Sequence, residues 1–235
     1  DPITATEKGM GTFAVHVTAN DLASSGAEPV GIMTSIILPP RKREKYLREL
    51  MGEIEAACRE LEIEIMGGHT EISNVVNQPV VTVTGVGKVK KEKLVSTGGL
   101  QVGDDLVLTK WAGLEGTAII AAQKREKLLE TLPEELVDTA ADFYQYLSVV
   151  PEAKIAVETG VSAMHDVTEG GIFGALWEIG AAADLGISAD LTKIPIRQET
   201  IEVCEVFGIN PYQMMSSGSM LIGCAKGNLL VDRLK

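Results

Sequence analysis

The sequence predicts a mixed α+β protein of two domains. Its 235 residues are enough for two small cores, and a hydrophobic content of 45% excludes a disordered or low-complexity chain. Helical and strand patterns follow one another in mixed order, which favours two α+β domains with sheets covered on one face over one doubly wound sheet. A turn-rich stretch at residues 96–105 indicates the boundary, so the predicted domains are residues 1–98 and 99–235.

The first domain is predicted to contain two helices and three strands. Its helices are predicted where apolar residues recur three and four positions apart, and its strands where β-branched or continuous apolar runs occur. Gly26 is typical of a helix end, and Pro39 with Pro40 ends the first strand. In chain order, we expect a helix over residues 9–25, a strand over 30–38, a helix over 43–62, a strand over 63–66 and a strand over 79–89.

The second domain is predicted to begin with a strand and to alternate less regularly. Proline opens two of its helices, and a Gly-Gly turn precedes another. The expected strands cover residues 105–109, 162–166, 187–191 and 219–224. The expected helices cover residues 114–124, 133–146, 151–158, 169–183 and 199–207.

The composition excludes several functional classes. The net charge is −12, and residues 101–235 carry 20 acidic and 10 basic side chains, so the chain lacks the basic footprint of a nucleic-acid binder. The longest nearly uncharged apolar run, residues 29–40, is too short to cross a bilayer, and no signal peptide is evident. Three cysteines without a CxxC pattern argue against disulfides and a zinc site and favour a reducing compartment, so we expect a cytoplasmic protein. From the charge and the short apolar run, we expect neither a nucleic-acid partner nor a membrane partner.

A first polar cluster lies within the helix predicted over residues 9–25. His16 and Asn20 are four positions apart and share one face of the helix, and Asp21 is next to them. A helix interior disfavours Asn and Asp, so two in succession suggest a binding site. A solvent-exposed polar face is the alternative interpretation, and the pattern alone leaves both open.

Two further clusters lie at the ends of predicted strands. The run from Gly67 to Glu71 reads GGHTE, where two glycines allow close approach of a phosphate or metal and polar groups follow; a plain glycine turn is the alternative. The run from His165 to Gly171 reads HDVTEGG and precedes a helix whose N-terminus favours anions. Here Asp166 and Thr168 are the candidates for binding, and simple N-capping is the competing explanation.

Two weaker candidates are also turns of small residues. Residues 113–118 read GLEGTA and match neither a Walker A motif nor GxGxxG, and residues 216–219 read SSGS and are interpreted as structural. No catalytic triad order, HExxH motif or zinc signature is present. Carboxylates and glycine turns recur in both predicted domains, which is the equipment for holding magnesium–nucleotide between them.

These clusters, in this order, resemble the aminoimidazole ribonucleotide synthetase superfamily. Its members include that purine enzyme, selenophosphate synthetase, thiamine-monophosphate kinase and the hydrogenase maturation protein HypE, whose branch is the most similar in motif form. The resemblance covers nearly the whole chain. The matching stretches are DPI, VHVTANDLASSGAEP, IMGGHTE, VGDDLVLTKWAGLEGTA, HDVTEGGIFGALWEIG and MSSGSMLIG.

The resemblance implies a ferredoxin-like N-terminal domain, an α+β C-terminal domain, and a homodimer in which the N-terminal domains join their sheets. It also implies ATP and Mg²⁺ in the cleft between the domains, with activation of an amide, carbamoyl or similar oxygen by phosphorylation. The metal contacts carried over are Asp1 and Asp21, with Glu71 in the glycine segment as a further candidate. The nucleotide contacts carried over are Asn20, Asp21, Gly67, Gly68, His69, Thr70, Asp166 and Thr168.

The chain departs from the family pattern at three places. His69 stands where members carry Asp or Glu, and an imidazole cannot replace a carboxylate oxygen on magnesium. Glu169 stands where HypE has Arg. HypE acts on a cysteine at its C-terminal end, whereas this chain ends at Lys235, and both domains are expected to be trimmed at their outer ends.

The departures keep two other functions in view. One is a small-molecule kinase or a selenophosphate-type synthetase, which would share the ATP site and differ in the acceptor. The other is a maturation partner that binds nucleotide or a related protein without catalysis, which the replacement at His69 motivates.

Overall fold

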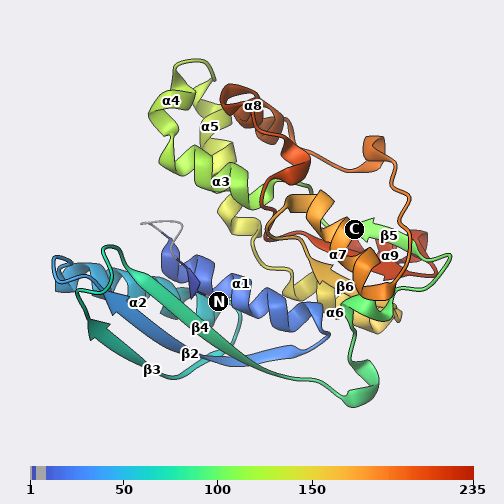
Figure 1. Cartoon of the computed structure of the whole chain (residues 1–235), viewed down its shortest axis with the longest axis horizontal. Helices are drawn as coiled ribbons and strands as arrows, with labels where there is room; N and C mark the ends of the chain where they lie inside the picture. Colours follow the sequence, from blue (N-terminus) through green and yellow to red (C-terminus); the bar gives the residue numbers. More distant parts are fainter. Residues whose placement is uncertain (1, 4–8) are drawn as a thin grey trace. The chain divides into compact units, whose positions relative to one another are not determined.

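The computed structural model describes residues 2–3 and 9–235, and the chain forms two compact units (Figure 1). Unit 1 comprises Asp1–Ala23 and Ala27–Lys90, and unit 2 comprises Ser24–Gly26 and Lys91–Lys235. Each unit has a sheet and helices of its own, so the α+β class is confirmed. The boundary after residue 98 stays a prediction.

The sheet of unit 1 has four strands in the order β1-β4-β2-β3. Strands β2 and β3 pair in parallel, and the other neighbours pair antiparallel. Helices α1 and α2 lie on one face of this sheet (Figure 1). The elements are β1 (Pro2–Ile3), α1 (Met10–Ser24), β2 (Glu28–Leu38), α2 (Glu44–Glu60), β3 (Glu64–Ile72) and β4 (Val80–Lys88).

The core of unit 1 lies between this sheet and the two helices. On β2, Ile32 and Ile36 are fully buried, whereas Met33 between them is 45% exposed on the opposite face. This alternation is the two-residue period of a strand with one face covered. The prediction of a sheet covered on one face is therefore confirmed for unit 1.

Helix α1 begins without a capping side chain of its own, and α2 supplies one. The carboxylate of Glu53 accepts hydrogen bonds from the backbone N–H of Gly9 at 3.0 Å and of Gly11 at 2.9 Å. Gly11 allows this approach, because a Cβ there would lie 2.7 Å from the carbonyl oxygen of Leu50. A negative charge at a helix N-terminus satisfies free N–H groups and favours the helix dipole.

The sheet of unit 2 has three antiparallel strands in the order β5-β7-β6. Every residue of the central strand β7 is buried, including Leu221 on one face and Ile222 on the other. The prediction that this sheet is covered on one face only is therefore wrong. Helix α7 packs against the side of Leu221. The elements are β5 (Asp105–Leu108), β6 (Ala163–Asp166), β7 (Met220–Cys224) and α7 (Gly171–Ala183).

The remaining helices of unit 2 fall into two groups: four share an apolar core of their own, and two pack beside each other next to the sheet. Helices α3, α4, α5 and α8 share an apolar core that includes Leu128 and Val203. Helix α9 contacts α6 and β5. Their bounds are α3 (Leu114–Gln123), α4 (Arg125–Leu129), α5 (Glu134–Ala141), α6 (Val150–Thr159), α8 (Gln198–Phe207) and α9 (Gly227–Leu234).

Several predicted elements of unit 2 differ from the structure. The strand predicted over residues 187–191 is wrong: residues 185–190 are irregular, and a 3₁₀ turn follows at Leu191–Lys193. Asp190 caps this turn, because its Oδ1 accepts from the backbone N–H of Thr192 at 3.0 Å. The helix predicted over 133–146 ends at Ala141 and continues as a 3₁₀ helix.

Within the described ranges, no helix has the length and apolar composition needed to cross a membrane.

Candidate functional site

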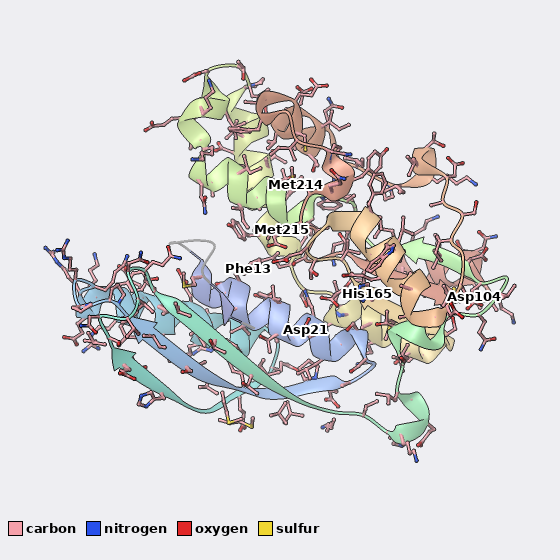
Figure 2. The ribbon with its side chains drawn as sticks, viewed as in Figure 1. Phe13, Asp21, Asp104, His165, Met214 and Met215 are labelled. Atoms are coloured by element: carbon pink, nitrogen blue, oxygen red, sulfur yellow. The ribbon has the colours of Figure 1, made fainter. Side chains whose placement is uncertain are left out.

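Helix α1 places the first polar cluster on two different faces. His16 and Asn20 are 3% and 1% exposed, whereas Asp21, labelled on α1 in Figure 2, is exposed. An exposed polar face therefore does not explain His16 or Asn20. Asp21 is the member of this cluster that a ligand can reach in unit 1.

His16 is a buried side chain next to a carboxylate. Its Nε2 lies 3.7 Å from Oε2 of Glu60, and its Nδ1 has no hydrogen-bond partner among the described residues. Burial lowers the pKa of His16, and the carboxylate of Glu60 opposes this shift. The imidazole thus serves the packing of α1 against α2, and we assign it no role in the site.

The second polar cluster is not a turn, as the glycine pair predicted, but the middle of a strand. Strand β3 continues through Gly67 and Gly68 to Ile72, because it pairs in parallel with β2 along its whole length. All nine of its residues are exposed, as expected for a strand at the edge of a sheet. The prediction that a strand ends at residue 66 is wrong.

The register of β3 fixes which way its polar residues face. Thr70 pairs with Ile36, whose side chain is buried under the helices, so Thr70 lies on the helix-covered face. His69 and Glu71 lie on the outer face, where Nε2 of His69 is 3.8 Å from Oε2 of Glu71. The structure therefore brings His69 and Glu71 together and turns Thr70 away from them.

The two glycines of this segment have different reasons to be glycine. A Cβ on Gly68 would lie 2.5 Å from the carbonyl oxygen of Thr34, so close packing against β2 requires glycine there. A Cβ on Gly67 would meet nothing within 4 Å. Strand packing therefore explains Gly68, and only Gly67 keeps open space on the outer face.

In unit 2, the ends of three strands meet at one edge of the sheet. The C-terminal end of β5 and that of β6 both lie beside the N-terminal end of β7, because both strands run antiparallel to β7. Asp166 pairs with Met220, and the backbone N–H of Val167 donates to the carbonyl oxygen of Ser219 at 3.0 Å. This edge therefore places Asp166 and Thr168 beside the turn at residues 216–219.

The start of α7 answers the N-capping question raised by HDVTEGG. Gly170 is the N-cap residue, no side chain caps the helix, and the helix starts at Gly171 rather than at residue 169. N-capping by Asp166 or Thr168 is therefore excluded. His165 lies on β6, directly before Asp166. Its Nε2 is 2.7 Å from Oε2 of Glu178, which lies on α7. Thr168 accepts a backbone bond from Gly171 at 3.1 Å through its carbonyl oxygen.

The two weaker candidates, residues 113–118 and 216–219, form one structure. The hydroxyl of Ser216 accepts from the backbone N–H of Gly113 at 2.5 Å, and the backbone N–H of Ser217 donates to Oε2 of Glu115 at 3.0 Å. The hydroxyl of Ser219 donates to the carbonyl oxygen of Trp111 at 2.6 Å. The turn at residues 216–219 is thus bound to the start of α3, about one hundred residues away in sequence.

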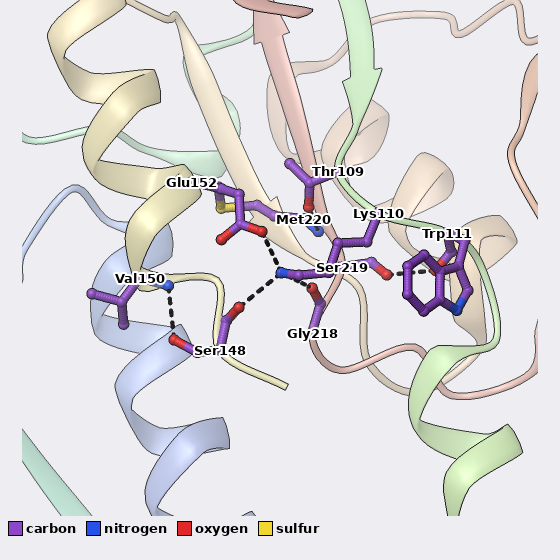
Figure 3. Close-up of polar contacts among 9 residues, drawn as sticks. All are labelled: Thr109, Lys110, Trp111, Ser148, Val150, Glu152, Gly218, Ser219 and Met220. Carbon is purple, nitrogen blue, oxygen red and sulfur yellow. Dashed lines mark hydrogen bonds and ion pairs between the residues drawn. The ribbon is translucent and has the colours of Figure 1, made fainter. Parts of the chain in front are cut away.

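Lys110 is a member of this strand edge that the sequence analysis missed (Figure 3). Its Nζ donates to the carbonyl oxygens of Ser148 and Gly218, each at 2.8 Å, and forms an ion pair with Glu152. Burial lowers the pKa of Lys110, and Glu152 opposes this shift. The signal available in the sequence was a lone lysine between an apolar strand and a tryptophan. The structure adds that Lys110 has a φ of 53°, which is uncommon for a residue other than glycine.

The residues predicted for the site are divided between the two units. Unit 1 presents Asp21 on α1 and His69 with Glu71 on β3, and unit 2 presents Asp166 and Thr168 at the sheet edge. Asp1 lies outside the described residues. Within the described residues, no group of three or more His, Cys, Asp or Glu side chains is arranged to hold a metal ion.

Comparison with known families covers nearly the whole chain. The N-terminal domain of AIR synthase related proteins matches residues 1–89, and the C-terminal domain matches residues 101–235. The chain belongs to the AIR synthase related protein family. The recognition of this superfamily from the motifs is thereby confirmed, and members of the HypE branch are among its relatives.

Individual members of the AIR synthase related family resemble the chain as follows. The carbamoyl dehydratase HypE of Cupriavidus necator is 31% identical over 92% of this chain and 60% of its own length. The crystal structure of Escherichia coli HypE superposes with a TM-score of 0.83 at 25% identity, over 96% of this chain and 68% of that one. A structure of the maturation protein HypE in complex with ATP gives 0.82 at 21%, over 96% and 66%. The chain spans about three fifths of the length of the curated relatives it matches.

Proposed function

We propose that the chain is an ATP-dependent enzyme of the HypE type, which uses Mg²⁺–ATP to phosphorylate a carbamoyl, amide or related oxygen. The observation that carries this proposal is the 31% identity, over 92% of the chain, to a carbamoyl dehydratase. A carbamoyl oxygen is a poor leaving group, and transfer of a phosphoryl group to it makes it a good one. The bound ATP of a HypE structure with the same fold supports the choice of nucleotide.

The proposed ligands are oxygen donors from carboxylates, which fit a hard divalent cation. Asp1, Asp21 and Glu71 are proposed to contact Mg²⁺. The proposal for Glu71 is favoured over one for His69, because an imidazole is a poor magnesium ligand and both side chains are on the same face of β3. The proposed nucleotide contacts are Asn20, Asp21, Gly67, Gly68, His69, Thr70, Asp166 and Thr168.

Replacing Asp21 by asparagine tests the proposal most directly. Because Asp21 is exposed, we expect Asp21→Asn to change the free energy of unfolding by less than about 0.5 kcal/mol. We expect its affinity for Mg²⁺–ATP to fall at least tenfold, since a charged ligand is lost. Isothermal titration calorimetry measures the affinity, and ADP release measures turnover.

The control for Asp21→Asn is Glu49→Gln, which removes another exposed carboxylate from unit 1, on α2. This variant should bind Mg²⁺–ATP as the parent does. Equal affinities of the parent and Asp21→Asn would contradict the assignment of Asp21. Failure of the parent chain to bind ATP would contradict the proposed function itself.

Product analysis separates this function from its alternatives. A solved thiamine-monophosphate kinase, bound to an ATP analogue and TMP, shares the fold with a TM-score of 0.77 at 20% identity, which keeps a small-molecule kinase as the second candidate. Phosphorus NMR should show inorganic phosphate with ADP for a dehydratase and a lasting phosphorylated acceptor for a kinase. Tight ATP binding without turnover would instead favour a non-catalytic maturation partner, and HypE does form a solved complex with HypF.

We also propose that unit 1 forms a homodimer through the outer face of its sheet. Met33, Met66 and Val86 are each 40–46% exposed there, and a Cβ on neighbouring Gly31 would lie 2.9 Å from the Met66 side chain. Exposed apolar side chains that gather on one face mark an interaction surface.

Sedimentation equilibrium at micromolar concentration should therefore give a dimer for the parent chain, and Met33→Glu should give a monomer. The variant Val75→Glu is the control, because Val75 is 81% exposed outside the sheet. It should leave the dimer intact. A monomeric parent, or a dimer that survives Met33→Glu, would contradict the proposal.

A further inference from the structure

Glu115 is a buried carboxyl group that stability alone does not explain. It is 1% exposed in the first turn of α3, and its Oε1 is buried without a hydrogen-bond partner among the described residues. Burial raises the pKa of Glu115 and repulsion from Glu169 adds to the shift, whereas hydrogen bonds from Ser217 oppose it. A buried polar atom without a partner costs stability, and in Glu115 this cost accompanies a contact that the other oxygen of the same carboxyl group makes.

The other oxygen of Glu115 makes a contact that leads to the predicted site. Oε2 accepts from the backbone N–H of Ser217 at 3.0 Å, which fixes one end of the turn at residues 216–219. At the other end of that turn, the carbonyl oxygen of Ser219 accepts from the backbone N–H of Val167 at 3.0 Å. Val167 is fully buried and lies between Asp166 and Thr168 in sequence.

We propose that Glu115 is a positioning residue: through the turn at residues 216–219, its carboxyl group fixes the backbone that carries Asp166 and Thr168. This inference rests on the proposed function, because Asp166 and Thr168 are proposed nucleotide contacts. Lys110 holds the same turn from another side, through the carbonyl oxygen of Gly218. The turn is therefore held by two side chains: Glu115 accepts from the backbone N–H of Ser217, and Lys110 donates to the carbonyl oxygen of Gly218.

Two substitutions separate positioning from general stability. Glu115→Gln keeps an oxygen that can accept from Ser217, so it should keep the parent's affinity for Mg²⁺–ATP within about twofold. Glu115→Met keeps the length of the side chain and removes both the acceptor and the unpartnered oxygen. We expect Glu115→Met to unfold within about 3 °C of the parent, because these two effects on stability oppose each other, yet to bind Mg²⁺–ATP about tenfold more weakly.

A second measurement needs no nucleotide. Amide hydrogen exchange over residues 163–171 should quicken at least tenfold in Glu115→Met and stay as in the parent in Glu115→Gln. The control is Thr200→Val, which removes a buried hydroxyl that hydrogen-bonds to Thr117 on α3 instead of to the turn. It should leave both the exchange over residues 163–171 and the affinity for Mg²⁺–ATP unchanged.

Two outcomes would overturn the inference. One is Glu115→Met with parental exchange over residues 163–171, because the turn would then not depend on Glu115. The other is a Glu115→Gln variant as impaired as Glu115→Met, because the negative charge rather than the hydrogen bond would then matter. If the parent itself binds no ATP, the proposed function fails, and the exchange data alone decide whether Glu115 holds the segment.

Discussion

Replacing Lys110 by methionine is expected to lower the free energy of unfolding of unit 2 by about 3–5 kcal/mol, since the partner carboxylate stays buried without its cation. The side chains of Lys110 and Glu152 are only 15% and 18% exposed, so water does not substitute for the lost contact. Two carbonyl oxygens, of Ser148 and Gly218, lose their donor as well. Both tryptophans of the chain, Trp111 and Trp177, belong to unit 2, so urea unfolding followed by tryptophan fluorescence reports on this unit.

A double-mutant cycle separates the ion pair from other effects of the change. Adding Glu152→Gln to Lys110→Met removes the unpaired charge, so the double variant should be less destabilised than the sum of the single variants by at least about 1 kcal/mol. The control is Lys154→Met, which removes an exposed lysine from α6, the helix that carries Glu152. It should change the free energy of unfolding by less than about 0.5 kcal/mol. A loss below 1 kcal/mol for Lys110→Met would contradict the importance of this contact.

Replacing Gly171 by alanine is expected to destabilise unit 2 by about 2–5 kcal/mol, through a strained backbone and direct overlap. Gly171 has a φ of 60°, and a Cβ there would lie 2.6 Å from the carbonyl oxygens of both Tyr212 and Met214. These are backbone atoms, so no side-chain rotation relieves the overlap. The midpoint of thermal unfolding, followed by tryptophan fluorescence, measures the effect.

Gly208 provides the matched control for Gly171. It has a similar φ of 64°, at the C-terminal end of α8, and a Cβ there would meet nothing within 4 Å. Gly208→Ala should therefore cost only the backbone term, about 1–2 kcal/mol. Equal losses for the two variants would show that the close approach of residues 212–214 to Gly171 has no energetic consequence.

Local sequence patterns predicted the elements whose interactions are local. The apolar spacing along residues 9–25 identified α1, and the apolar run before Pro39 identified β2, because burial of one helix face or of a strand leaves a periodic trace. The glycine pair at residues 67–68 was misleading. Glycine suggests a turn, whereas here a parallel neighbour supplies backbone hydrogen bonds and Gly68 fits against Thr34.

The polar edge of the sheet in unit 2 could be predicted only in part. Asp166 and Thr168 were singled out because they lie at the end of a predicted strand and before a predicted helix, and their role as ligand contacts stays a prediction. Lys110 was not singled out, and Glu115 was named only within the weaker candidate at residues 113–118, since their partners at the turn of residues 216–219 are 108 and 102 residues away. Nothing in the spacing of a single sequence indicates contacts at such a distance, and the burial of Glu115 becomes visible only in three dimensions.

The position of β7 between β5 and β6 has a consequence for the order of folding. Strands β5 and β6 do not pair with each other, so the sheet of unit 2 cannot form until residues 220–224 are in place. During synthesis, the sheet of unit 2 therefore cannot form before this segment has left the ribosome. Contacts that close loops of about one hundred residues form slowly, so assembly of unit 2 should be a late step that chaperones can assist.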